Sequence, residues 1–142
     1  MPRAARFTLP GYPHHVTQRG NRRQQTFFQT QDYADYLDRL RGACERFGVA
    51  CWAYCLMPNH VHLILEPRDE SGLAAALKQT HQSCTRRINA RVGWTGCLWR
   101  GRFSSCAMDE GQRKNGNRHH YRAGSVRPYQ RKLVPVPVNL AR

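Results

Sequence analysis

One short run constrains the fold of this chain more than any other: residues 56–65, with the sequence LMPNHVHLIL. Apolar residues alternate with the two histidines of this run, which is the period of a half-buried β-strand. Successive side chains of a strand point to opposite faces, so the alternate aliphatic residues are expected to face the core. These are Val61, Leu63 and Leu65. His60 and His62 then lie together on the other face, roughly 7 Å apart along the strand.

The residues before the histidines complete a β-hairpin. Residues 57–59, Met-Pro-Asn, indicate a turn, and residues 52–56 are expected to form the preceding strand. A neutral imidazole is a good metal ligand, and two on one face can hold one divalent ion with coordination positions to spare. The alternative is that His60 and His62 are polar residues on a solvated sheet face, because short motifs often match by chance.

The charge of the chain indicates a polyanionic partner. Its 142 residues suffice for one domain that buries a core without disulfides or a structural metal. The 23 Lys and Arg against 9 Asp and Glu give a formal net charge of +14. Such an excess repels itself in a compact state unless a polyanion binds, so nucleic acid is the expected partner and an anionic membrane surface the competitor. We find no apolar run of membrane-spanning length and no signal peptide, so we expect a cytoplasmic protein that does not act at a membrane.

The cysteines are expected to be reduced and structural. None of the six belongs to a CxxC pair, and zinc fingers space their ligands differently. A structural zinc site is the alternative. The six residues are Cys44, Cys51, Cys55, Cys84, Cys97 and Cys106.

Two amphipathic helices are predicted from apolar residues at helical spacing. The first begins with Asp32 as its N-cap and ends at Gly48. The second is capped by Ser71 and ends at Gly93. Each has one apolar stripe, which indicates a helix packed on a sheet.

Further strands are expected at residues 15–19 and 102–106. The order strand, helix, hairpin, helix, strand predicts an α+β fold, an antiparallel sheet with helices on one face. Residues 1–110 are expected to form this domain. Residues 111–142 are basic and differ in composition, with no Asp or Glu.

Seven arginines are candidates for contact with nucleic acid. Three of them follow or lie in a Gly/Asn-containing loop, where they could contact phosphates. Two lie on the outer surface of the second predicted helix. Two stand beside aromatic residues, and charge combined with aromatic surface is typical of proteins that bind single-stranded nucleic acid. The alternative for each group is a solvated run of charge. The seven are Arg19, Arg22, Arg23, Arg86, Arg87, Arg100 and Arg102.

Three ordered motifs resemble those of a known family. PNHVHL at residues 58–63 resembles the His-hydrophobic-His motif of the HUH single-strand endonucleases, and with the preceding Leu-Met it is similar to the REP-associated tyrosine transposases. YPHHVTQRGN at residues 12–21 and WRGRFSS at residues 99–105 resemble that family in order and spacing. The resemblance runs from about residue 6 to about residue 110.

The resemblance implies a ferredoxin-like βαββαβ fold with an additional C-terminal helix. It places His14 and His15 on a core strand in a structural role, and it makes His60 and His62 the ligands of a divalent metal ion, Mg²⁺ or Mn²⁺. The implied activity is endonuclease cleavage and strand transfer of single-stranded DNA through a 5′-phosphotyrosine. The implied substrate carries hairpins or palindromic repeats such as REP elements. The implied protein is a nucleoid-associated monomer or homodimer.

Residues 111–142 depart from the family pattern. The family carries its nucleophilic tyrosine on a helix after the last motif, but residues 111–117 are poor helix formers. Tyr121 is the best candidate nucleophile, because its distance from the histidine pair is close to that expected of the family, and Tyr129 is the reserve. The third metal ligand is not identifiable, and His119 and His120 are the nearest chemical possibilities. The alternative for either tyrosine is a surface aromatic in a disordered basic tail.

A frameshift or a rearranged gene end is one hypothesis for this tail, and a divergent but functional tail is the other. Alignment of the genomic DNA in all three frames distinguishes them. Three function classes stay open: an active nuclease-transposase, a degenerate relative that only binds hairpin DNA, and a basic RNA-binding or membrane-surface protein. Because residues 111–125 have few apolar side chains to anchor a catalytic tyrosine, we expect DNA binding with poor cleavage or none.

Overall fold

The predicted hairpin is present in the computed structural model, which describes residues 7–108. Strand β2 spans Val49–Met57 and strand β3 spans His60–Pro67, with Pro58 and Asn59 in the turn between them. The two strands pair antiparallel, with Met57 opposite His60. The turn therefore places the first histidine at the very start of β3.

The sheet has four strands in the order β2-β3-β1-β4, and each neighbouring pair is antiparallel. β1 spans His14–Arg19 and β4 spans Ser104–Ala107, close to the predicted ranges. This strand order is that of the ferredoxin-like βαββαβ fold, which confirms the expected architecture. β3 lies inside the sheet, so its side chains have a neighbouring strand on both sides.

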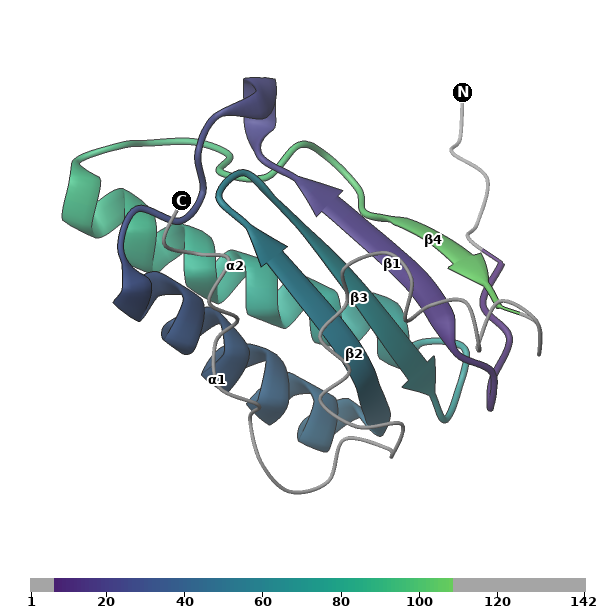
Figure 1. The fold of residues 1–142 in the computed structure, drawn as a ribbon. Coiled ribbons are helices and arrows are strands. Elements are labelled where there is room, and N and C mark those ends of the chain that lie inside the picture. Colours follow the sequence, from purple (N-terminus) through teal and green to yellow (C-terminus); the bar gives the residue numbers. More distant parts are fainter. Residues whose placement is uncertain (1–6, 109–142) are drawn as a thin grey trace.

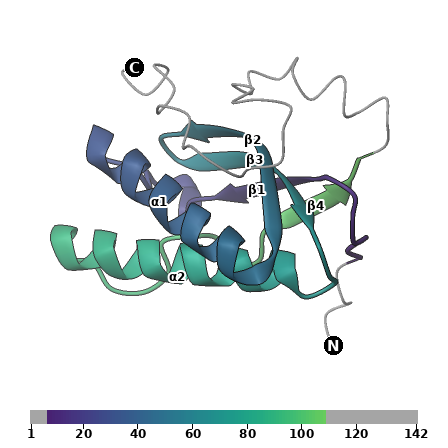
Figure 2. The same ribbon diagram turned by 90° about the horizontal axis from the view of Figure 1, so that it is seen from below.

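Both helices cover the same face of the sheet (Figure 1). α1 spans Thr30–Phe47 and α2 spans Gly72–Val92, and the two pack against each other beneath the strands (Figure 2). Their apolar stripes meet the inward residues of the strands in one buried cluster. We call the opposite face of the sheet the far face. The helices end, as predicted, at Gly48 and Gly93, both with positive φ.

The first helix begins earlier than predicted. Gln29 is its N-cap, and Asp32 lies three residues inside the helix as the partner in a capping box. The Asp32 carboxylate accepts hydrogen bonds from the backbone N–H groups of Phe28 and Gln29, and it pairs with Arg91 of α2. Burial alone would raise the pKa of Asp32, but Arg91 and these N–H groups hold it below its ordinary value. The acidic residue therefore joins the two helices besides capping one.

The second helix also uses a different cap from the predicted one. Ser71 occupies the N-cap position, but its side chain makes no capping hydrogen bond. The Asp69 carboxylate takes that role, because its Oδ1 accepts from the N–H groups of Ser71 and Gly72 at 3.0 and 2.8 Å. An acidic side chain here also suits the positive end of the helix dipole.

All six cysteines lie within the described residues and are unbridged. Four are buried, and burial raises the pKa of Cys51 and Cys84 to about 12, so both remain thiols at neutral pH. Cys97 and Cys106 are exposed. Between residues 7 and 108, no helix is long and apolar enough to cross a membrane.

Candidate active site

The two histidines of the motif lie side by side on the far face of β3. Their ring centroids are 5.1 Å apart and the ring planes are nearly perpendicular, at 80°. The strand pairing places His60 opposite Arg19 of β1, and His62 opposite Thr17 of β1 and Cys55 of β2. The predicted alternation is confirmed, because Val61 between them is fully buried on the other face.

A hydrogen bond to its own neighbour orients His60. Its Nδ1 lies 2.8 Å from Oδ1 of Asn59, so the tautomer that donates from Nδ1 leaves a lone pair on Nε2. Partial burial, and then the positive charge of Arg19, lower the pKa of His60. A neutral imidazole is the form that binds metal ions. The local environment of His60 therefore favours the metal-binding protonation state.

His62 has a histidine partner that the sequence did not identify. Nε2 of His15 lies 3.2 Å from Nδ1 of His62, and the two rings stack with centroids 5.4 Å apart. His14, one residue earlier, lies on the core side and is fully buried, and its ring bonds the backbone at Leu9 and Tyr12. The structural role expected for His14 and His15 therefore fits His14. His15 lies on the far face instead and contacts His62 of the site. Strand alternation predicts that one of the two neighbouring histidines lies on the far face. Only the register between β1 and β3 shows that this histidine, His15, reaches His62.

A cavity of about 640 Å³ opens beside the histidine pair. It brings together three of the seven predicted arginines, Arg19, Arg100 and Arg102, with His60 and His62. None of the described residues that line it is acidic. The cavity therefore combines two possible metal ligands with a concentrated positive charge, which suits a phosphate.

Backbone contacts fix the segment that brings the distant arginines here. The N–H of Arg100 donates to the carbonyl of Arg19 at 2.8 Å, and Gly20 forms a bridge with Trp99. The side-chain amide of Gln18 donates to the carbonyl of Gly101 at 3.1 Å. The end of β1 therefore holds residues 99–101 against the site.

Gly20 permits the tight turn that follows β1. A Cβ at this position would lie 2.2 Å from the carbonyl oxygen of Gln24, so a larger residue would not fit. The next two arginines, Arg22 and Arg23, are exposed and have φ of 55° and 59°, a conformation that costs energy for any residue except glycine. Strained backbone thus presents two positive charges next to the site, without lining the cavity itself.

The remaining predicted DNA contacts lie on α2. Arg86 is exposed and lines a second cavity together with Arg102. Arg87 forms an ion pair with Asp35 of α1, so this guanidinium is already engaged between the helices. Its contact with DNA stays a prediction. Arg91 pairs with Asp32 in the same way.

The donors around the histidine pair fit a metal ion only in part. His60 and His62 can supply two nitrogen ligands, and within residues 7–108 no group of three or more His, Cys, Asp or Glu is placed to hold an ion. Such a pair needs further ligands from water, phosphate or another part of the chain. The predicted nucleophile Tyr121, its reserve Tyr129 and the candidate ligands His119 and His120 lie outside the described residues.

The family model described as "Transposase IS200 like" matches residues 10–118 of this chain, which is most of its length. The chain belongs to this family. The match to the IS200-like transposases includes the histidine pair and the three arginines of the cavity, and it extends a few residues past the predicted domain end at residue 110. Tyr121 lies just beyond the matched range.

Solved structures share the fold of this IS200-like transposase. One is a REP-associated tyrosine transposase bound to a REP hairpin, with a TM-score of 0.58, 20% identity, and coverage of 84% of this chain and 68% of the other. Another, from Deinococcus radiodurans R1 and also described as a transposase, has a TM-score of 0.55 and 22% identity over 83% of this chain and 95% of its own. None of the curated proteins matches this chain.

Proposed function

We propose that this IS200-like transposase binds hairpin-bearing single-stranded DNA across the far face and cleaves it beside the histidine pair. One observation carries the proposal: His60, His62, Arg19, Arg100 and Arg102 meet in one cavity free of acidic described residues. The related fold that was solved with a REP hairpin makes palindromic repeat DNA the first substrate to test. Family membership alone does not specify that substrate.

The arginines of the cavity would bind the phosphates on either side of the scissile bond. Guanidinium groups match phosphate oxygens with two parallel hydrogen bonds, and their charge is not lost at any physiological pH. Arg100 and Arg102 are exposed and come from a segment tied to β1, so they would hold the phosphate in a fixed place.

His60 and His62 would hold a divalent metal ion, Mn²⁺ or Mg²⁺. Imidazole ligands suit Mn²⁺ at least as well as Mg²⁺, which prefers oxygen. When bound, such an ion stabilises the negative charge that develops on a phosphate under attack. The contribution of the protein is to present two imidazoles, one in contact with Asn59 and the other with His15.

Tyr121 would be the nucleophile. Its phenol oxygen forms a bond to phosphorus, the bond to the 3′ oxygen breaks, and the departing oxygen takes up a proton while the phenol loses one. The products are a 5′-phosphotyrosine and a free 3′-OH, and the covalent bond retains the energy needed for rejoining. Strand transfer by this route requires no ATP.

Binding without cleavage is the second candidate function. The composition of residues 111–125 favours it, because Gly, Asn and basic residues dominate there and few apolar residues could anchor a catalytic tyrosine. A DNA-binding domain of residues 7–108 would then act without its nucleophile. The two candidates share the DNA surface and differ only in the covalent step.

A nicking assay decides between them. The full chain is incubated with Mn²⁺ and a labelled single strand that carries a hairpin, and covalent adducts are separated on a denaturing gel. Cleavage that disappears in Tyr121→Phe, with DNA affinity nearly unchanged, supports the transposase. Hairpin binding without any adduct supports the binding function, and an adduct mapped by mass spectrometry to another residue shows that Tyr121 is not the nucleophile.

A further inference from the structure

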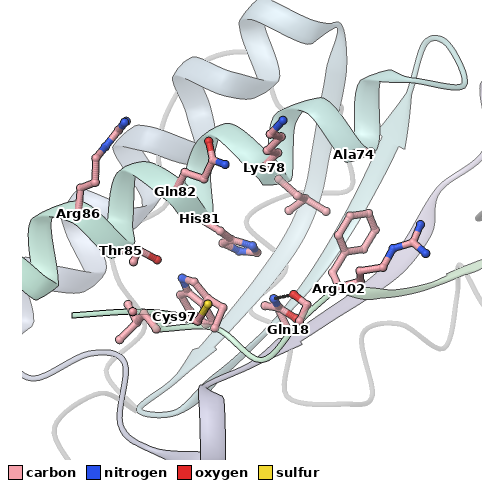
Figure 3. Close-up of a pocket in the computed structure, with 15 residues that line it drawn as sticks. Gln18, Ala74, Lys78, His81, Gln82, Thr85, Arg86, Cys97 and Arg102 are labelled. Atoms are coloured by element: carbon pink, nitrogen blue, oxygen red, sulfur yellow. Dashed lines mark hydrogen bonds between the residues drawn. The ribbon is translucent and has the colours of Figure 1, made fainter. Parts of the chain in front are cut away.

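A second cavity, of about 690 Å³, lies on the helical side of the sheet. It is bounded by α2 and by residues 96–103, the segment that leads into β4. In Figure 3, His81 and Thr85 point from α2 toward the segment that carries Cys97, and Gln18 and Arg102 close the other end. The cavity has no part in the metal chemistry proposed above.

The wall and the rim of this cavity differ in chemistry. The wall is aromatic and aliphatic, with Leu77, Trp99 and Phe103 among its members. The centroid of the His81 ring lies 4.7 Å from that of the Trp99 ring, and the two ring planes are tilted by 31°. Burial lowers the pKa of His81 to about 3, so this ring is uncharged at neutral pH.

The rim is cationic. Lys78 and Arg86 stand on α2, Arg102 stands opposite, and none of the described residues that line the cavity is acidic. Figure 3 shows Lys78, Gln82 and Arg86 along one side of α2, at the successive four-residue spacing of one helix face. A ligand that matches this cavity would combine a flat apolar part with negative charge close to it.

An unsatisfied donor in the wall indicates a polar ligand atom as well. The indole Nε1 of Trp99 is buried and has no hydrogen-bond partner among residues 7–108. Trp99 as a whole is only 5% exposed. Since a buried donor without a partner costs free energy, a ligand that carries an acceptor would offset this cost.

The two cavities adjoin each other. Gln18, Gly101 and Arg102 line both, so the segment of residues 101–102 separates them. A DNA strand whose phosphates lie along Arg100 and Arg102 would pass the mouth of the second cavity. One nucleotide of chain spans only several ångströms, so a base next to the scissile phosphate is within reach.

We propose that this cavity binds one unpaired nucleobase of the DNA strand, with the adjacent phosphates on Arg102 and Arg86. The inference rests on the proposed DNA function. Stacking on aromatic side chains recognises a base by its flat surface, and base-edge acceptors such as ring nitrogens and carbonyl oxygens would suit the unsatisfied indole N–H and the Gln82 amide. The charge of the rim excludes a purely apolar occupant.

Scanning with abasic sites tests the proposal on the full chain. The probe is a hairpin oligonucleotide with single-stranded flanks, in which each flanking base is removed in turn and affinity is measured by fluorescence anisotropy. One position should stand out, with affinity reduced about 5- to 100-fold when its base is missing. The neighbouring abasic sites should change affinity much less, because their phosphates remain.

Two matched variants connect that position to the cavity. Ala74 and Ala90 are both exposed on α2, but only Ala74 lines the cavity. Ala74→Trp should weaken binding of the intact oligonucleotide, since the inserted indole occupies the place of the base. It should also flatten the abasic profile, which is the affinity measured for each abasic position in turn. Ala90→Trp should leave both affinity and profile unchanged.

The outcomes separate this proposal from the proposed function. Hairpin binding with a flat abasic profile overturns the nucleobase site and leaves the DNA function in place, whereas no hairpin binding by the unmodified chain overturns both. An unchanged abasic profile in Ala74→Trp also overturns the nucleobase site. If the same variant alters the melting temperature or the oligomeric state of the DNA-free protein, the cavity is assigned to a protein segment instead.

Discussion

Nδ1 of His62 lies 3.2 Å from Nε2 of His15, a residue 47 positions earlier in the chain. The contact exists because β1 and β3 pair with Thr17 opposite His62, which leaves His15 as the diagonal neighbour on the same face. Only one hydrogen fits between two neutral rings, so one ring must donate and the other accept. Donation by His62 leaves its Nε2 with the lone pair that a metal ion needs. We infer that His15 positions His62 for ligation.

Replacement of His15 should therefore weaken metal binding without abolishing it. His15→Ala removes the acceptor for His62 Nδ1–H, and loss of such a partner typically costs about 10- to 100-fold in metal affinity. His15→Gln keeps an acceptor at similar reach and should restore part of the affinity. Titration calorimetry with Mn²⁺ measures both, and equal affinity in the unmodified protein and His15→Ala would exclude the positioning role.

Removal of either ligand should have a larger effect. His60→Ala or His62→Ala should each abolish Mn²⁺ binding, because a site with two protein ligands does not tolerate the loss of one. Arg41→Ala, on the exposed face of α1 and outside the histidine cavity, serves as the control and should retain binding. Unchanged calorimetric affinity in both histidine variants would mean that the pair is not a metal site.

The arginines of the histidine cavity should set the salt dependence of DNA binding. Each phosphate contact that is lost reduces the slope of log affinity against log salt by about 0.7 for a single strand. Arg100→Ala and Arg102→Ala should each show this reduction. Arg41→Ala on α1, where the side chain pairs with Glu45, is the matched control. Equal slopes in all three variants would contradict the proposed DNA surface.

Two substitutions at Arg22 should separate backbone strain from charge. Arg22 has φ of 55°, which glycine adopts at little cost and alanine does not. Both Arg22→Gly and Arg22→Ala should weaken DNA binding, since both remove the guanidinium. Only Arg22→Gly should stabilise the fold, by up to about 1 kcal/mol in urea unfolding. If the two variants are equally stable, the strained conformation is absent in solution.

His81 should make the fold sensitive to acid. Its pKa falls from an ordinary value near 6.5 to about 3, so between these values the unfolded chain binds more protons than the folded one. Stability should therefore fall as the pH drops below 6.5, by about 2 kcal/mol between pH 7 and pH 5. His81→Gln can keep the hydrogen bond with the Tyr36 hydroxyl, 2.9 Å away, and should show a smaller loss over this range in urea unfolding. An equal loss in both proteins would assign the acid sensitivity to other groups.

Most of the local structure could be predicted from periodicity. The alternation around Val61 and Leu63 indicated β3 and its faces, and Gly48 and Gly93 marked both helix ends. These signals are local, because side-chain direction in a strand or helix follows from the backbone period alone. The caps of both helices differ from the predicted ones because capping depends on more than the helical period. Asp32 and Asp69 reach backbone N–H groups through loop geometry that the pattern does not specify.

The members of the site could be predicted only in part. His60 and His62 are two residues apart, so the strand period brought them together, and the resemblance to a transposase family indicated their chemistry. The strand period places His15 on the first strand, but it does not show that His15 contacts His62. Its contact depends on the register between β1 and β3, and register is a long-range property.

Tertiary packing also decided which arginines are grouped around the histidines. The sequence determined the excess of positive charge and the helix on which Arg86 and Arg87 lie, because composition and period are readable in one dimension. Only the packed structure pairs Arg87 with Asp35 across two helices, and only it brings Arg100 and Arg102 to the histidines. The physical reason is that an ion pair or a shared cavity depends on distances between residues far apart in the chain, which are fixed by burial of the whole core.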